Sequence, residues 1–332
     1  AGVSVGTVSN VLNGGRVSEA RRKLVEASIE KLGYQVNTLA KGMRMQKTDY
    51  VVVILPNLIN PYFALLLDAL ESELSAVGKQ VLLCLSGDDA EREVAFMDMA
   101  KQNKVDGIIG VTYSKVEEER IENMAFVSID RHYKSHIPCV AGDNWQGGWL
   151  AAENLHKRGS TNLLCFMTMS SVDSEVRKRR VGFTEYCMEH DLSCNSVEMS
   201  EKQIVSVYES YGSRKLIHNM LRAYISPSMG EHSIDGIFTS SDHLATIVRE
   251  ELEEMGKRVP EDIQIIGYDG LQFLNQGKPI VSSIAQPVHE IAKEAVRCLN
   301  ELIANGKTEG NTKIPVSFQE GPTTKTLVTE EK

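Results

Sequence analysis

The sequence predicts two doubly wound α/β lobes built on parallel sheets, preceded by a small all-α head. The first 48 residues contain only helical patterns, whereas short apolar runs alternate with amphipathic stretches from Tyr50 onward. That alternation is typical of parallel sheets with helices on both faces. The chain has 332 residues, and about eight apolar runs exceed one core of ordinary size, so two lobes are expected.

Two helices are expected in the head, and a third depends on a partner. Ser4 can cap the first helix, which runs to about Asn13, and Ser18 can cap the second, over residues 19–32. A third short helix over residues 37–45 carries too little apolar surface to fold alone in water. The apolar side chains available for packing in the first helix are Val5, Val8, Val11 and Leu12.

Continuous apolar runs predict the buried parallel strands, and amphipathic stretches between them predict the helices. The strands are expected over residues 51–55, 81–85, 107–111, 126–129, 163–167, 234–238, 263–266 and 281–284, with a further strand near Val140. The helices are expected over residues 63–77, 90–102, 145–157, 177–190, 205–225, 242–255 and 288–304. The predicted domains are the head over 1–48, an N-terminal lobe over 49–157 and 288–316, and a C-terminal lobe over 158–287 and 317–332.

The charges divide the chain in the same way. Residues 1–48 contain eight Lys and Arg against three Glu, a net charge of +5 in a chain whose total is −9. A basic head on an acidic body is typical of nucleic-acid binding, because Lys and Arg displace counterions from phosphates. The same charges also fit a solvated helical face, and charge alone does not decide between these interpretations.

Composition narrows the class of protein. No run of 18 apolar residues is present, and the first residues lack the basic-then-apolar layout of a secretory signal. The cysteines have no paired spacing and are expected as buried small hydrophobes rather than as disulfides. They are Cys84, Cys139, Cys165, Cys187, Cys194 and Cys298. These features predict a cytoplasmic protein.

Polar and aromatic side chains follow several of the predicted strands. Ligands of open parallel sheets bind beyond the carboxyl ends of the strands, where these side chains would converge. Carboxylates accept from hydroxyls, guanidinium groups donate and aromatic faces cover C–H surfaces, so the mixture suits a sugar. Any one of the aspartates could instead be a helix cap. The candidate residues are Asn60, Tyr62, Phe63, Asp130, Arg131, Asp143, Arg179, Ser241, Asp242, Asp269 and Gln286.

Several short segments are specific through their order and spacing. They are residues 3–14, Leu32-Gly33-Tyr34, residues 37–40, residues 60–63, Ile129-Asp130-Arg131, Asp143-Asn144, Arg179 with Gly182-Phe183, residues 266–269 and residues 283–287. Together they resemble the LacI/GalR family of bacterial transcription repressors along nearly the whole chain. The resemblance implies a homodimeric regulator with a helix-turn-helix head and two lobes like those of type I periplasmic binding proteins.

The resemblance also implies how the head would bind operator DNA. Asn10 can hydrogen-bond to a base edge, Val5 offers apolar contact to a thymine methyl, and Gly6 has no side chain. A hinge helix would fold in the minor groove, where Met43 wedges between bases. The remaining candidate DNA contacts are Ser4, Thr7, Ser9, Asn37 and Ala40.

In the lobes, the resemblance assigns the candidate strand-end residues to a pocket for a carbohydrate or sugar-phosphate effector, with no cofactor. Arg179 would donate to ligand oxygens, Asp269 would accept from hydroxyls, and Tyr62 and Phe63 would wall the pocket. Two departures stand out. The family has about a dozen residues before the position of Ala1, so the first helix of the motif is missing from this sequence. Ser241 stands where sugar-binding relatives often have Asn.

Three other interpretations compete with a regulator. An extracytoplasmic sugar-binding receptor of a transport system would share the two lobes, but the basic head and the missing signal segment disfavour it. An enzyme is disfavoured because no nucleophile elbow, P-loop or Rossmann glycine triplet is present. His132, His136 and Cys139 lie near one another, but their spacing is not that of a zinc site. A phosphocarrier co-repressor is a further partner of some family members, and the sequence has no clear footprint for it.

Overall fold

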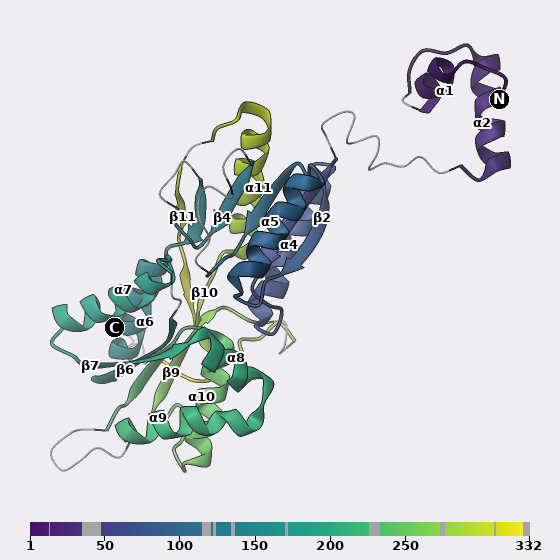
Figure 1. Cartoon of the computed structure of the whole chain (residues 1–332). Helices are drawn as coiled ribbons and strands as arrows, with labels where there is room; N and C mark the ends of the chain where they lie inside the picture. Colours follow the sequence, from purple (N-terminus) through teal and green to yellow (C-terminus); the bar gives the residue numbers. More distant parts are fainter. Residues whose placement is uncertain are drawn as a thin grey trace. The chain divides into compact units, whose positions relative to one another are not determined.

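The chain divides into two compact units, residues 1–49 and residues 50–332, in a computed structural model (Figure 1). The structure describes residues 1–12, 14–34, 48–114, 121, 124–133, 137–169, 172–225, 233–272, 276–308 and 310–327. The predicted helix over residues 37–45, with Asn37, Ala40 and Met43, lies outside the described residues.

The first unit contains the two predicted helices, α1 (Val5–Leu12) and α2 (Glu19–Leu32). The backbone N–H of Thr7 donates to Ser4 Oγ at 3.2 Å, which confirms Ser4 as the cap of α1. Ser18 occupies the cap position of α2 without a side-chain hydrogen bond, and the helix ends at Gly33 in the left-handed region. The expectation that Val5 packs is wrong: its side chain is 87% exposed, whereas Val11 of the same helix is buried.

The first lobe of residues 50–332 is built on a six-stranded parallel sheet in the order β11-β5-β4-β3-β1-β2. The strands are β1 (Tyr50–Leu55), β2 (Gln80–Leu85), β3 (Gly107–Gly110), β4 (Phe126–Ile129), β5 (Cys139–Gly142) and β11 (Thr312–Ile314). Val51 and Val53 pack beneath α4 (Pro61–Ala76) and α11 (Val288–Asn305). Val52 and Ile54 point to the opposite face and pack against α5 (Ala90–Gln102). A strand buried on both faces needs a continuous apolar run, which explains the sequence of β1.

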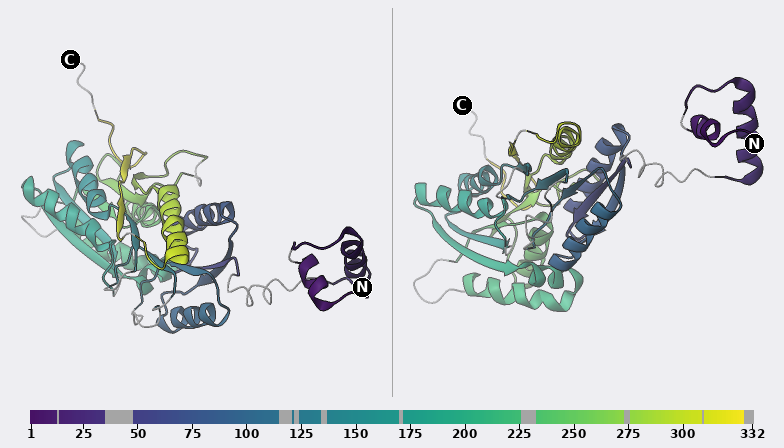
Figure 2. Two further views of the ribbon diagram at one scale, coloured as in Figure 1. Left: turned by 90° about the horizontal axis from the view of Figure 1, so that it is seen from above. Right: turned by 45° about the horizontal axis from the view of Figure 1, so that its top comes forward.

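The second lobe repeats this plan with the order β12-β10-β9-β8-β6-β7. The strands are β6 (Asn162–Met169), β7 (Ser193–Ser200), β8 (Gly236–Thr239), β9 (Gln264–Asp269), β10 (Ser282–Ala285) and β12 (Ser317–Gln319), of which β12 is antiparallel. One face is covered by α6 (Asn144–Lys157) and α7 (Arg177–Glu189). The other is covered by α8 (Glu201–Glu209), α9 (Lys215–Ile225) and α10 (Asp242–Glu254) (Figure 2).

The predicted fold class is confirmed, and the differences concern particular elements. The single helix expected over residues 205–225 is two helices separated by the 3-10 turn η2 (Tyr211–Arg214), since Ser210 adopts an extended conformation. Strand β7 was not expected because its sequence is largely polar and most of its residues are not buried. The antiparallel edge strand β12 is also an addition to the expected parallel sheet.

The position of α6 differs from the predicted lobe boundary at residue 157. Its residues Ala151, Ala152 and Leu155 belong to the core of the second lobe rather than to that of the first. The chain therefore leaves the first lobe directly after β5. It crosses between lobes twice more, between β10 and α11 and between β11 and β12.

Two predictions from composition can be compared with the structure. All six cysteines are free thiols, and all except the half-buried Cys194 are buried, as expected of small hydrophobic side chains. Within the described part of the chain, the helices are too short or too polar to cross a membrane.

Candidate functional site

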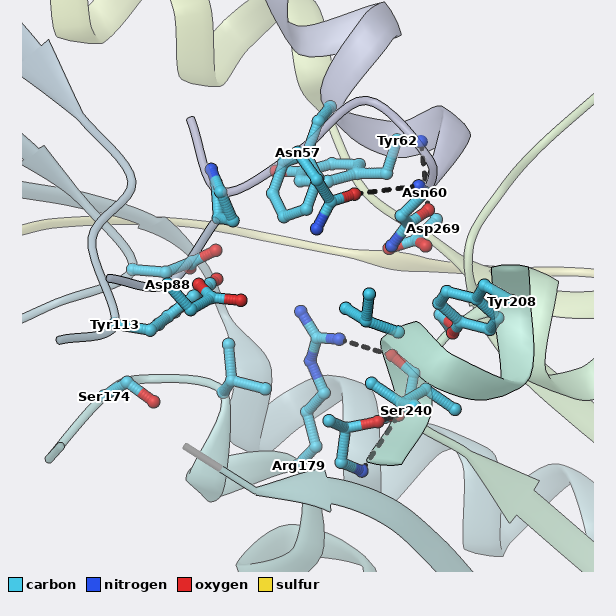
Figure 3. Close-up of a pocket in the computed structure, with 18 of the residues that line it drawn as sticks. Asn57, Asn60, Tyr62, Asp88, Tyr113, Ser174, Arg179, Tyr208, Ser240 and Asp269 are labelled. Atoms are coloured by element: carbon cyan, nitrogen blue, oxygen red, sulfur yellow. Dashed lines mark hydrogen bonds between the residues drawn. The ribbon is translucent and has the colours of Figure 1, made fainter. Parts of the chain in front are cut away.

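A cavity lies between the two lobes (Figure 3). Segments that follow β1, β2, β3 and β4 line it from the first lobe, and segments that follow β6, β8 and β9 line it from the second. In each sheet the strand order reverses, between β3 and β1 and between β8 and β6. Such a switch point leaves a crevice at the carboxyl ends of parallel strands, where ligands bind.

Most of the candidate strand-end residues lie together in this cavity. Residues that are far apart in the sequence line the same cavity, as predicted for side chains that follow the strands of parallel sheets. The candidates that line the cavity are Asn60, Tyr62, Phe63, Asp130, Arg179, Ser241, Asp269 and Gln286.

The first-lobe wall is held by the start of α4. Asn60 caps the helix, because its Oδ1 accepts from the backbone N–H of Tyr62 at 3.1 Å, and Pro61 occupies the first helical position. This cap fixes Tyr62 and Phe63, whose rings pack edge to face with centroids 5.5 Å apart. Burial raises the pKa of Tyr62, so its hydroxyl stays protonated. The pair therefore gives the cavity an apolar wall with a polar tip.

Arg179 is the central donor, and second-lobe residues fix its guanidinium. Its Nε donates to Asn144 Oδ1 at 2.6 Å and its Nη1 donates to the carbonyl of Ser240 at 2.8 Å. The guanidinium carbon lies 3.5 Å from the centroid of the Tyr268 ring. Asn144 in turn donates to Asp130 Oδ1 at 3.3 Å. Asp130 belongs to the first lobe, so this chain of hydrogen bonds crosses the cavity wall between lobes.

Asp269 ends β9 and is held as an acceptor. Its Oδ1 accepts from Gln286 Nε2 at 3.0 Å. Burial raises the pKa of Asp269 to about 7, with the charge of Arg179 acting against the shift. Its φ of 121° is unusual for a residue with a side chain, and Asp130 also has a positive φ of 60°. Strained backbone of this kind is concentrated at functional sites.

Several polar atoms at the cavity have no hydrogen-bond partner within the described residues. Buried polar atoms are normally satisfied, so their grouping at one cavity indicates a ligand with several hydrogen-bonding groups. They are Tyr62 Oη, Asp88 Oδ1, Ser174 Oγ, Asp269 Oδ2 and Gln286 Oε1.

Three candidate residues do not line the cavity, because the fold uses them elsewhere. Arg131 donates to Thr112 Oγ1 and to the carbonyl of Ser114, and its guanidinium covers the Tyr133 ring. Asp143 caps α6 by accepting from the N–H of Gln146 at 3.0 Å. Asp242 lies fully buried at the start of α10 and accepts from the N–H of Leu271 at 2.7 Å. Of the two roles considered for each aspartate, helix cap or ligand acceptor, Asp143 has the first.

The cavity also contains residues that the sequence analysis missed. Asn57, Asp88 and Tyr113 follow β1, β2 and β3, so the strand-end rule could have found them. Ser174 lies in the longer segment between β6 and α7. Tyr208 lies on α8, bonds to Ser241 at 3.1 Å and stacks on the ring of His243. No strand-end signal points to Tyr208, because it lies in the last turn of α8.

The part of the chain that the structure describes contains no group of three or more His, Cys, Asp or Glu that could hold a metal ion. His132 instead bonds to Glu175, and Cys139 is buried in β5. His136 lies outside the described residues.

The head presents the candidate DNA contacts of α1 at its surface. Ser4, Val5, Gly6, Ser9 and Asn10 are exposed, and Thr7 is half-buried. The side chain of Val5 is 87% exposed.

Comparisons with known proteins agree with this two-part organisation. Residues 1–37 match the family described as bacterial regulatory proteins, lacI family, and residues 152–324 match the periplasmic binding protein-like domain. The chain is 32% identical over 325 residues to a sucrose operon repressor from Pediococcus pentosaceus, covering 97% of this chain and 96% of that protein. It is 31% identical over 301 residues to a ribose operon repressor from Halalkalibacterium halodurans, covering 90% and 86%.

Solved structures share the fold. A periplasmic binding protein/LacI transcriptional regulator from Alkaliphilus metalliredigens, complexed with D-xylulofuranose, superposes with a TM-score of 0.71 at 26% identity and covers 84% of this chain and 100% of its own. The Lac repressor bound to ONPG superposes with a TM-score of 0.79 at 23% identity over 98% of this chain and 97% of its own. Because two relatives covered over most of their length exceed 30% identity and each unit contains a domain match, the chain belongs to the lacI family of bacterial regulatory proteins.

Proposed function

We propose that the chain is a repressor that binds operator DNA through its head, and that a small sugar in the cavity between the lobes controls this binding. The observation that carries the proposal is the set of unpartnered oxygens around Arg179 and the Tyr62–Phe63 wall. Carboxylate and amide oxygens accept from hydroxyls, the guanidinium donates, and aromatic faces cover the C–H side of a sugar ring. Relatives named for sucrose and ribose operons support the same ligand class.

The DNA-binding part of the proposal rests on α1. Its exposed side chains offer hydrogen-bonding and apolar groups suited to base edges and phosphates, and residues 1–48 are strongly basic. We propose that Val5, Gly6 and Asn10 face base edges and that Ser4, Thr7 and Ser9 bind phosphates. Contacts from Asn37, Ala40 and Met43 in the minor groove stay predictions.

The regulator would act as a homodimer, because an operator with two half-sites matches a protein with two-fold symmetry. It would act in the cytoplasm and would not catalyse a reaction. Binding of the sugar would change operator affinity by a coupling of about 1–3 kcal/mol. A phosphocarrier co-repressor stays a prediction. A transport receptor would have no use for a basic DNA-binding head, so the alternative is not favoured.

Asp269→Ala tests the cavity as the effector site. DNA that the full-length protein selects from a random pool is labelled, and its binding is followed by fluorescence anisotropy with and without sugars. The wild type is expected to change operator affinity in the presence of one sugar, whereas Asp269→Ala keeps DNA binding and loses the response. Asp269 is a buried acceptor with a free Oδ2, so its removal takes away a charge-assisted hydrogen bond.

Glu261→Ala is the matched control, because Glu261 is an exposed acidic residue of the same lobe. It should respond to the sugar as the wild type does. An unchanged response in Asp269→Ala would refute the cavity assignment, and binding to all DNA sequences with equal affinity would refute the operator function.

A further inference from the structure

The cavity has two polar ends rather than one. Figure 3 places Asn60, Asp269 and Tyr208 on one side of the Arg179 guanidinium, and Asp88, Tyr113 and Ser174 on the other. Gln286 belongs to the first end, since it donates to Asp269. Residues from both lobes form the second end: Asp88 and Tyr113 follow strands of the first lobe, and Ser174 precedes α7 of the second.

Unpartnered buried atoms occur at both ends. Asp269 Oδ2 and Gln286 Oε1 have no hydrogen-bond partner at the first end, and Asp88 Oδ1 and Ser174 Oγ have none at the second, within the described residues. Ser174 is only 3% exposed. Buried polar atoms without partners are unfavourable, so the second end also awaits hydrogen-bonding groups of a ligand.

The local fold does not account for Asp88. An aspartate at this point would ordinarily cap the following helix, but the neighbouring Asp89 does so, accepting from the N–H groups of Glu91 and Arg92. Asp88 instead has a positive φ of 57°, and its side chain lines the cavity. The carboxylate is therefore available to a ligand.

Asp88 is also a charged group. Burial raises the pKa of Asp88 to about 6, so its carboxylate is ionised at neutral pH, and Arg177 also lines the cavity. A negative group with an unpartnered oxygen accepts from hydroxyls and repels a phosphate.

We propose that Asp88, Tyr113 and Ser174 form a second subsite, and that the effector is a neutral disaccharide with one ring at each end of the cavity. This inference rests on the proposed function and specifies its ligand. A single sugar ring would satisfy the acceptors beside Asp269 and leave those beside Asp88 without partners. A phosphate at the second end would meet the Asp88 carboxylate.

Isothermal titration calorimetry on the full-length protein tests the subsite. The probes are sucrose, maltose, lactose and trehalose, their component monosaccharides, ribose and glucose 6-phosphate. One disaccharide is expected to bind at least about tenfold more tightly than either of its component sugars, since the second ring adds hydrogen bonds at the second end.

Two variants locate the effect. Asp88→Ala should weaken the disaccharide by about 10- to 100-fold, because it removes a charged acceptor, and Ser174→Ala should weaken it by a smaller factor. Both should weaken the component sugar that binds beside Asp269 by a smaller factor than the disaccharide, and continued binding of that sugar shows that the variant is folded. Glu91→Ala is the control, since Glu91 is an exposed acid three residues from Asp88.

The outcomes separate this inference from the proposed function. If a monosaccharide binds as tightly as any disaccharide and Asp88→Ala has no effect, the second subsite is wrong and the sugar-controlled repressor stands. Tighter binding of glucose 6-phosphate than of every disaccharide would overturn the neutral ligand. If no sugar of any size binds, the proposed function fails and the inference fails with it.

Discussion

Buried carboxylates determine how the cavity behaves at the scale of single residues. Asp130 and Asp269 flank Arg179, and burial raises the pKa of both despite the positive charge between them. Asn144 donates to Asp130 and Gln286 donates to Asp269, and these hydrogen bonds hold the two side chains in place without a ligand. Acceptors fixed in advance lose little freedom on binding, which favours affinity for a ligand with well-placed hydroxyls.

Glu93 is a buried carboxylate outside the cavity, and its titration gives a test of the fold. Its Oε1 accepts from Ser114 Oγ at 3.1 Å, and its Oε2 has no partner within the described residues. Burial raises the pKa of Glu93 to about 7 from an ordinary value of 4.5. The folded state therefore binds a proton that the unfolded state has released, and this stabilisation is lost as the pH rises through about 7.

Glu93→Gln should remove this pH dependence. The free energy of unfolding of the wild type is expected to fall by about 2 kcal/mol relative to the variant between about pH 5 and pH 8. Urea unfolding at several pH values measures the difference, and Glu91→Gln, at an exposed position of the same helix, should follow the wild type. Parallel curves for wild type and Glu93→Gln would contradict the raised pKa.

The strand-end rule could predict most of the cavity from the sequence, and its failures have physical reasons. It found Asp269 because this residue ends a recognisable apolar strand, and Asp130 and Gln286 because each directly follows one. It also selected Asp143, since a cap and a ligand acceptor occupy the same sequence position. Asp88 also satisfies the rule, because it follows β2, whereas Tyr208 does not, because its place in the cavity depends on how α8 packs.

At the scale of elements, the crossing of α6 and α7 positions Arg179. A Cβ at Gly148 would lie 1.8 Å from the carbonyl oxygen of Arg179, and one at Gly182 would lie 2.0 Å from the carbonyl oxygen of Trp145. The two helices therefore touch through their backbones, and both glycines are required by this approach. The crossing also packs α6 onto the second lobe, although the sequence predicted that the first lobe extends to residue 157.

Gly148→Ala should separate the helices and displace Arg179. We expect the free energy of unfolding to fall by about 3 kcal/mol or more, because the added methyl meets backbone that cannot rotate away. Urea unfolding measures this change. Gly212→Ala is the control, since the nearest atom to its Cβ would be a side-chain oxygen at 3.7 Å, and it should change stability by less than about 1 kcal/mol. Equal stability of the two variants would refute the close crossing.

Elements with continuous apolar runs could be predicted, and elements that depend on tertiary contacts could not. Strand β1 and helix α5 agree with the sequence to within a residue or two at each end. Strand β7 has a polar sequence, and its pairing with β6 defines it as a strand. The break between α8 and α9 has only Ser210 and Gly212 as local signals, which are too weak to outweigh the helical spacing around them.

At the scale of the whole molecule, the lobes are joined by polar contacts beside the cavity. The N–H of Glu175 donates to the carbonyl of Asp130 at 2.8 Å, and the Glu175 carboxylate faces His132 and Lys313 of the first lobe and Lys178 of its own. Asp130 is therefore a cavity residue and part of the link between lobes. A ligand that bonds to Asp130 acts directly on that link.

The two units should respond differently to heat and to the effector. In residues 1–49, the hydrophobic side chains that are more than nine-tenths buried among the described residues are Val11 and Val25, a small core that predicts low stability. Residues 50–332 contain the large cores of both lobes and the cavity. Differential scanning calorimetry should therefore resolve a weak transition of the head below the main transition.

A bound sugar should raise only the main transition, because it binds only the folded lobes. At about 100 times its Kd it adds about 2.7 kcal/mol of stability, which corresponds to a Tm rise of about 5 °C or more for a unit of this size. Asp269→Ala should abolish that rise and leave the head transition where it is. A rise of both transitions with sugar would contradict the prediction, because it would mean that the two units unfold together.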